Sequence, residues 1–249
     1  MNRLFSEPPR LIGVIAKKRA GKDTLAAALA KHGYRRIAFA DRLYEEVASA
    51  YDVTTAFLRN DATKETDLPE LALRNCKDQV FVEVGLIKAL GGDWCADILA
   101  FLDSRPLGHA ARERIEMELA KPRSPRWTTQ TWGTEYKRMR VSNRYWLEVI
   151  ERTVNASPGS RFIITDTRFL NETDCVYGLG GITLRIRRKK IDDEAARGKA
   201  TGDPKWCHPS ETELDEHKAT VEVENREGDP DFMAEAVCRM FGLEEPQPA

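Results

Sequence analysis

The sequence has no long apolar run. Its N-terminal region offers only the short apolar stretch 11–16, preceded by two prolines and one acidic residue. A membrane-spanning helix needs roughly 18 consecutive apolar residues, and the two prolines and the acidic residue before so short a stretch fit no signal peptide. We therefore expect no membrane partner and a cytoplasmic location.

Cysteine is also scarce. The five cysteines are odd in number, widely spaced and form no Cys-x-x-Cys pair. This usage is typical of free thiols in a reducing compartment, so we expect no disulfides. Cys207, His208 and His217 resemble a set of metal ligands only in their residue types, because their spacing fits no standard zinc site.

The chain lacks an excess of charge of either sign. Its 39 basic and 40 acidic residues leave a formal net charge of −1, whereas a dedicated binder of duplex DNA normally needs a basic excess. From His208 onward the chain has 12 acidic and 3 basic residues, so the first 207 residues together carry a net positive charge. Glycine and proline are too few for a disordered chain, and 249 residues allow one or two domains with a large core.

A loop that could bind phosphate follows the first apolar stretch. Residues 10–16 read as a buried strand, residues 17–24 (Lys-Lys-Arg-Ala-Gly-Lys-Asp-Thr) as a loop, and residues 25–31 as a helix. Nucleotide phosphates need backbone N–H groups, a helix N-terminus and a lysine, and this order of elements supplies all three. The sequence therefore predicts a phosphate-binding loop of the P-loop type.

Each residue of this loop has an expected role. Gly21 permits close backbone approach, Lys22 reaches the β- and γ-phosphates, and Thr24, or Asp23 through water, holds Mg²⁺. The residues expected to contact ATP are Arg19, Ala20, Gly21, Lys22, Asp23 and Thr24. The loop departs from the usual motif at two positions, because Ala16 replaces its first glycine and Asp23 follows the lysine.

The rest of the chain predicts an α/β fold with a parallel central sheet. Further strands are expected at 36–40, 161–165, 182–186 and 219–223, and helices at 42–51, 79–90, 93–102, 110–121, 144–154, 170–177 and 231–241. Asp41 and the pair Ser124-Pro125 are expected to begin helices. Residues 52–122 contain no confident strand, which is typical of a helical insertion that covers a substrate. Residues 187–209 are charged and lose periodicity, which predicts a mobile loop.

Several stretches resemble the deoxynucleoside monophosphate kinases of tailed phages. Besides the loop, they are Phe39-Ala-Asp-Arg-Leu43, Ser124-Pro-Arg with Gln130, Gly133, Thr134, Glu135, Arg138 and Trp146, the run Ile163-Ile-Thr-Asp166-Thr-Arg168-Phe-Leu-Asn171-Glu172, and His208-Pro-Ser-Glu211. Together they cover roughly residues 10–60 and 123–241. Residues 85–122 match nothing in that family that we can place.

The resemblance implies a fold and a reaction. It implies one P-loop kinase domain over residues 1–249, a three-layer fold with a helical monophosphate-binding insertion at 52–122 and a lid-like segment at 187–209. The implied reaction transfers the γ-phosphoryl group of ATP to a deoxynucleoside monophosphate, with Mg²⁺ as cofactor, for DNA precursor supply. A phage-encoded enzyme of this kind would act in the host cytoplasm.

The resemblance also implies site residues. Lys22, Arg138, Arg168 and Asp166 are expected to be catalytic, and Arg187, Arg188 and Arg197 to belong to the lid. The residues expected to bind the substrate are Lys18, Phe39, Ala40, Asp41, Arg126, Gln130, Gly133, Thr134, Arg138, Trp146, Asp166, Arg168 and Glu172. Arginine suits phosphate because its planar fork binds two oxygens at once.

Each of these assignments has a structural alternative. Asp166 could cap the helix expected at 170–177, Trp146 and Phe39 could belong to the core, and the charged lid residues could simply be solvated. The function has alternatives too. They are a P-loop kinase of another small phosphorylated acceptor, of the dephospho-coenzyme A or phosphomevalonate type, and a nucleotide-binding regulator or nucleic-acid-associated NTPase. We expect no stable nucleic-acid binding, and residues 85–122 could form a homodimer surface or an enlarged substrate cover.

Overall fold

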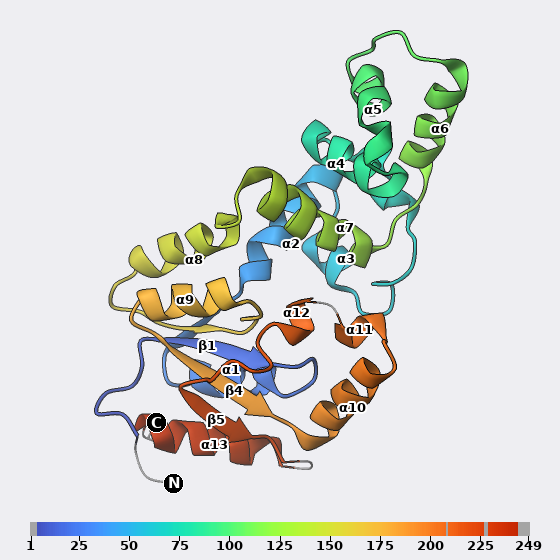
Figure 1. The fold of residues 1–249 in the computed structure, drawn as a ribbon. Helices are drawn as coiled ribbons and strands as arrows, with labels where there is room; N and C mark the ends of the chain where they lie inside the picture. Colours follow the sequence, from blue (N-terminus) through green and yellow to red (C-terminus); the bar gives the residue numbers. More distant parts are fainter. Residues whose placement is uncertain (1–3, 208, 227–228, 244–249) are drawn as a thin grey trace. The chain divides into compact units, whose positions relative to one another are not determined.

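The computed structural model describes residues 4–207, 209–226 and 229–243. Its residues form two compact units (Figure 1). Met1–Phe39 and Leu147–Ala249 make up the first, which we call the sheet unit, and Ala40–Trp146 make up the second, which we call the helical unit. No described helix combines the length and the apolar character needed to cross a bilayer.

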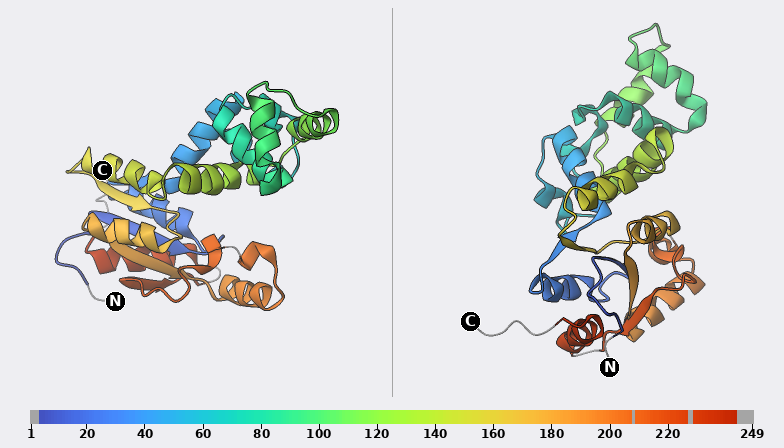
Figure 2. Two further views of the ribbon diagram at one scale, coloured as in Figure 1. Left: turned by 45° about the horizontal axis from the view of Figure 1, so that its top comes forward. Right: turned by 90° about the vertical axis from the view of Figure 1, so that its left-hand side faces the viewer.

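The sheet unit contains a five-stranded parallel sheet. The strands are β1 (Leu11–Ala16), β2 (Tyr34–Ile37), β3 (Arg161–Ile164), β4 (Ile182–Arg187) and β5 (Val221–Glu224), in the spatial order β2-β3-β1-β4-β5. The central strand β1 is buried almost throughout, because helices cover both faces of the sheet (Figure 2). The predicted α/β fold with a parallel central sheet is confirmed.

Helices on the two faces bury different apolar residues. On one face α1 (Lys22–Ala30) packs against α13 (Pro230–Phe241), and Leu25, Leu29 and Val237 join the apolar side chains of β1 there. On the other face lies α9 (Leu170–Gly178), whose Val176 approaches Gly13 so closely that a Cβ on that glycine would lie 2.9 Å from a methyl group. The helix α8 (Tyr145–Asn155) lies beside α9 (Figure 1).

The second strand ends earlier than the sequence predicts. The expected strand 36–40 is β2, which stops at Ile37, and α2 (Phe39–Tyr51) already begins at Phe39. The expected N-cap, Asp41, therefore lies inside the first turn of α2. The physical reason is a carboxylate from a distant segment, because Asp166 Oδ1 accepts a hydrogen bond of 2.8 Å from the Phe39 N–H and satisfies the helix start.

Residues 187–209 are more ordered than predicted. Instead of an irregular loop they contain α10 (Lys189–Ala200) and α11 (Pro204–Cys207). Ile191 and Ala195 lie one helical turn apart and pack with Trp206 in a small separate core. The charged residues of α10 outnumber the apolar residues of this narrow stripe. The sequence therefore does not reveal the helical spacing of the apolar positions. A further short helix, α12 (Pro209–Thr212), follows, and His208 lies outside the described residues.

The described helical unit contains helices and no strand. After α2 it comprises α3 (Thr55–Arg59), the 3₁₀ turns Pro69–Leu71, Leu73–Asn75 and Gly92–Trp94, then α4 (Gln79–Leu90), α5 (Cys95–Leu102), α6 (His109–Ala120), α7 (Pro125–Thr131) and the π-helix η4 (Trp132–Val141). Ser124 accepts a hydrogen bond from the Trp127 N–H and caps α7, as expected. Phe81, Trp132 and Tyr136 form an aromatic core, with ring centroids 4.7 Å apart between the first two.

Candidate nucleotide site

The phosphate loop joins β1 to α1 and has an unusual backbone. Arg19 and Gly21 have φ angles of 66° and 109°, in the region that glycine tolerates and other residues rarely adopt. Residues with this left-handed backbone conformation let successive N–H groups converge on an anion. Asn225, at the end of β5, donates a hydrogen bond of 2.7 Å to the carbonyl of Ala20 and fixes the loop.

The helix that follows the loop has a free N-terminus. Gly21 is its N-cap and no side chain caps the first N–H groups of α1. A helix start without a side-chain cap suits an anion, because the first N–H groups lack intrahelical partners and the helix dipole is positive there. Lys22 Nζ lies 3.2 Å from Asp23 Oδ2, and Asp23 is exposed while Thr24 is half-buried. Hydroxyl and carboxylate oxygens are ligands that Mg²⁺ prefers, so Thr24 and Asp23 fit the expected metal.

Asp166 follows β3 at the carboxyl edge of the sheet. Its bond to Phe39 places it at the start of α2. The helix expected at 170–177 is α9, and its N-cap residue is Phe169 rather than Asp166. That position is served by Glu172, whose Oε2 accepts hydrogen bonds from the N–H groups of Arg168 and Phe169, at 2.8 and 3.3 Å. Glu172 is only 2% exposed, so its carboxylate shapes the β3–α9 loop.

A small charged pocket lies where β1, β3 and β4 end. Lys17, Arg168, Arg185 and Arg187 line it together with Asp192, Glu211 and Asp215. The Arg168 guanidinium contacts the Glu211 carboxylate, and Lys17 Nζ lies 2.6 Å from Asp215 Oδ1. Ligands of open α/β sheets bind outside the carboxyl ends of the strands, which is where this pocket lies.

The three expected lid arginines have different surroundings. Arg188, just before α10, donates a hydrogen bond of 2.8 Å to the carbonyl of Arg19 and so touches the phosphate loop. Arg187 ends β4 and lies 3.6 Å from Glu222 of β5, and Arg197 is exposed on α10. Of this group, only Arg188 has a contact with the phosphate loop among those the structure describes.

The remaining expected residues of the sheet unit are Lys18, which is exposed in the loop, and Phe39. Phe39 is 5% exposed, which places it in the core, the alternative to lining a base pocket. Ala40 and Asp41 belong to the helical unit. Asp41 forms an ion pair of 2.9 Å with Arg59, whose guanidinium also lies over the ring of Tyr44.

The expected substrate residues of α7 and η4 differ in exposure. Gln130 and Thr134 are exposed, whereas Arg138 is half-buried. Arg126 Nε is paired with the Glu65 carboxylate. Trp146 is 4% exposed and donates a hydrogen bond of 3.1 Å to the carbonyl of Gly133, so its placement is that of a core residue. Gly133 is required by packing, since a Cβ there would lie 2.8 Å from Leu43.

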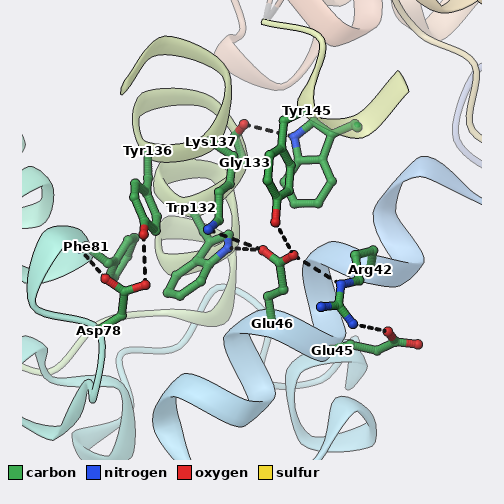
Figure 3. A network of polar contacts seen from close by, with 11 residues as sticks. Arg42, Glu45, Glu46, Asp78, Phe81, Trp132, Gly133, Tyr136, Lys137 and Tyr145 are labelled. Carbon is green, nitrogen blue, oxygen red and sulfur yellow. Dashed lines mark hydrogen bonds and ion pairs between the residues drawn. The ribbon is translucent and has the colours of Figure 1, made fainter. Parts of the chain in front are cut away.

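A carboxylate that the sequence did not single out organises the face of η4 shown in Figure 3. Glu46 accepts hydrogen bonds from Tyr145 Oη at 2.6 Å and Trp132 Nε1 at 3.0 Å. Lys137 Nζ lies 3.6 Å from the same carboxylate, and Arg42 Nε lies 3.1 Å from it. A π-helix has about one residue more per turn than an α-helix, so Trp132 and Lys137 share this face.

The neighbouring Asp78 links the start of α4 to η4. Its Oδ1 accepts a hydrogen bond from the Phe81 N–H and caps α4, and its Oδ2 accepts one of 2.9 Å from Tyr136 Oη. Burial, with the bond to Asp78, holds the pKa of Tyr136 well above its ordinary value of 10.0. Tyr136 therefore stays protonated and keeps donating to Asp78 at neutral pH.

The five cysteines differ in burial. All five thiols are free. Burial raises the pKa of the Cys76 thiol to about 11, so it stays protonated at neutral pH. Among the described residues no group of three His, Cys, Asp or Glu side chains could hold a metal ion, and of the expected His208-Pro-Ser-Glu211 motif His208 lies outside them.

Sheet order, loop and uncapped helix together define a class of protein. A parallel sheet in the order β2-β3-β1-β4-β5, with a glycine loop between its central strand and the next helix, is the architecture of P-loop kinases.

The chain is a distant homologue of the deoxynucleoside-5'-monophosphate kinase of Escherichia phage T5. The two are 25% identical over 228 residues, which cover 87% of this chain and 89% of the phage protein. The uncharacterized protein ORF77 of Ictalurid herpesvirus 1 (strain Auburn) is 36% identical over 89 residues, about a third of either chain. No protein-family model matches the chain. The resemblance expected from the motifs is thereby confirmed as a distant relationship.

Proposed function

We propose that this chain transfers the γ-phosphoryl group of ATP to a deoxynucleoside monophosphate, giving the diphosphate and ADP. The observation that carries the proposal is the relationship to the phage T5 enzyme, because it spans 87% of the chain and so includes both units. The phosphate loop and the uncapped start of α1 support it, since both are arranged for an anionic ligand.

In this proposal the donor phosphates lie on the phosphate loop. The N–H groups at the start of α1 and the Lys22 ammonium would neutralise the β- and γ-phosphates. Thr24, and Asp23 through water, would hold Mg²⁺, which supplies charge neutralisation when bound. Arg188 already touches the loop through the Arg19 carbonyl and is assigned to the donor phosphates.

The acceptor side needs cations and no general base. An acceptor phosphate oxygen is already a nucleophile, so positioning and charge neutralisation carry the reaction. Arg168 of the sheet unit is assigned to the acceptor phosphate, with Lys18 of the same unit, while Arg126 and Arg138 of the helical unit stay predictions from the family resemblance. Gln130 and Thr134 are exposed hydrogen-bonding groups that suit contacts to the base or sugar.

The test is a direct assay of product. The purified protein is incubated with ATP, Mg²⁺ and, in turn, dAMP, dGMP, dCMP, dTMP or a modified pyrimidine monophosphate, and diphosphates are separated chromatographically. At least one diphosphate is expected. Lys22→Ala should lower turnover by a factor of about 100 or more, whereas Lys31→Ala, which removes an exposed lysine just after α1, should leave it unchanged.

Other outcomes would replace the proposal. No diphosphate from any monophosphate would refute it, and turnover of dephospho-coenzyme A or phosphomevalonate in the same assay would assign another small acceptor. ATP hydrolysis stimulated by a polynucleotide would assign an NTPase. The two expectations for residues 85–122, a homodimer surface and an enlarged substrate cover, both stand as predictions. Analytical ultracentrifugation tests whether the protein is a dimer.

A further inference from the structure

An acidic turn in the sheet unit holds cations from four different elements. It consists of α12 and the residues that follow it, up to His217. Glu211 contacts the Arg168 guanidinium with its carboxylate and Lys17 Nζ with its backbone carbonyl. Asp215 contacts Lys17 with one carboxylate oxygen and Lys199 of α10 with the other.

Backbone carbonyls of the same turn hold one more cation. Arg185 Nη2 donates hydrogen bonds of 2.6 Å to the carbonyls of Leu214 and His217. The turn therefore contacts the phosphate loop, the end of β3, strand β4 and α10. All four lie within the sheet unit.

These contacts lie in a partly dry environment. The side chains of Lys17 and Glu211 are 17% and 15% exposed, and that of Arg185 is 5% exposed. Ion pairs that are partly shielded from water are stronger than pairs on an open surface. Here the Arg168, Lys17 and Arg185 side chains line one small pocket, so without the two carboxylates their like charges would repel one another.

A cation that receives a phosphate must be held in place before the phosphate arrives. Lysine and arginine side chains lose much rotamer freedom when they are ordered, and a carboxylate that orders them beforehand removes that cost from binding. Glu211 occupies one nitrogen of Arg168 and leaves others of the guanidinium fork for an anion.

We propose that Glu211 and Asp215 are positioning residues of the phosphate site. Glu211 fixes the guanidinium of Arg168, and Asp215 ties Lys17 of the phosphate loop to Lys199 of α10. The inference rests on the proposed function for its effect on catalysis, and on the geometry alone for its effect on α10. Burial opposes ionisation of Asp215, but hydrogen bonds from Lys17 and Lys199 outweigh it and hold its pKa below the ordinary value, as a fixed charge requires.

The substitution Glu211→Gln tests the role assigned to Glu211. Glutamine keeps the shape and removes the charge, so kcat/KM for the monophosphate should fall about tenfold or more, while KM for ATP changes less. Glu211→Asp keeps the charge and should recover part of the loss. Glu216→Gln is the matched control, because it removes the same charge from an exposed position in the same turn, and it should behave as the wild type.

A double-mutant cycle separates positioning from a general structural role. If Glu211 acts through Arg168, Glu211→Gln should have little further effect in an Arg168→Lys background. Equal losses in both backgrounds would overturn this part. If the wild type and Glu216→Gln are active and Glu211→Gln matches them, the positioning role fails while the proposed function stands. An inactive wild type would instead refute the proposed function.

The role assigned to Asp215 is tested by a measurement that does not depend on enzymatic activity. Asp215→Asn should raise the amide hydrogen-exchange rate of α10 at least several-fold, because the tie from Lys199 to the phosphate loop is weakened. Exchange in α13, which packs against α1 and β5, should stay unchanged, as should exchange in Glu216→Gln. Unchanged exchange of α10 in Asp215→Asn would overturn the role assigned to Asp215.

Discussion

Replacing Gly21 by alanine should both strain and crowd the phosphate loop. The φ angle of Gly21 is 109°, and a Cβ built there would lie 2.3 Å from Asn225 Nδ2. Holding a residue other than glycine in such a conformation costs about 1–3 kcal/mol. Displacing Asn225 also breaks its bond to the Ala20 carbonyl, for about 1–3 kcal/mol more. We expect a total destabilisation of about 2–6 kcal/mol.

A matched glycine separates the two contributions. Gly33 also has a positive φ, 81°, but a Cβ there meets nothing within 4 Å. Gly33→Ala should therefore cost only the backbone strain, about 1 kcal/mol. Urea denaturation, followed by circular dichroism, measures the free energy of unfolding of both variants.

A double variant tests the role of Asn225. Asn225→Ala alone should cost about 1–2 kcal/mol, because it leaves the Ala20 carbonyl without this donor. In the double variant Gly21→Ala/Asn225→Ala the crowding is absent, so the loss should fall short of the sum of the single losses by about 1 kcal/mol or more. Additive losses, or a Gly21→Ala loss no larger than that of Gly33→Ala, would refute the reasoning.

Three further predictions concern carboxylates. Asp166→Ala should destabilise the protein by about 1 kcal/mol and speed hydrogen exchange in the first turn of α2, because the Phe39 N–H loses its acceptor. Glu46→Gln should cost about 1–3 kcal/mol in urea denaturation, since an amide cannot accept all the donors that Figure 3 shows around this side chain, whereas the exposed Glu45→Gln should stay within about 0.5 kcal/mol of the wild type. Because the pKa of Asp215 is lowered in the folded state, its stabilisation is complete above the ordinary value of 3.8 and is lost as the pH falls through the lower folded value. The difference in free energy of unfolding between wild type and Asp215→Asn should accordingly be constant well above pH 3.8 and shrink as the pH falls below that value.

The elements that depend on local pattern could be predicted from the sequence. The buried strands β1 and β3 are apolar runs, and β4 alternates apolar residues with threonine and arginine. The phosphate loop stands between β1 and a helix of alanine and leucine. Ser124-Pro125 marks the start of α7 by cap chemistry alone. In each case the residues that decide the structure are neighbours in the chain, so a short window contains the whole signal.

The features that depend on distant partners could not be predicted. Asp166 and Phe39 are 127 positions apart, and Glu46 and Tyr145 are 99 apart. Neither contact can be recognised in a short window of sequence, because one carboxylate and one hydrogen-bond donor do not form a periodic pattern. The π-helical form of η4 could not be predicted for the same reason, since Trp132 and Tyr136 on its wider turn contact Glu46 and Asp78 of other segments. The small core around Trp206 was hidden by the charges of α10.

The bond from Asn225 to the Ala20 carbonyl has a consequence for the synthesis of the chain. Ala20 leaves the ribosome early, but its partner is made 205 positions later. The central strand β1 likewise waits for β3 and β4 before its hydrogen bonds are complete. The finished geometry of the phosphate loop therefore forms only after residue 225 has been synthesised. Contacts of such long sequence separation also make folding slow, which leaves the nascent N-terminal half dependent on partners that do not yet exist.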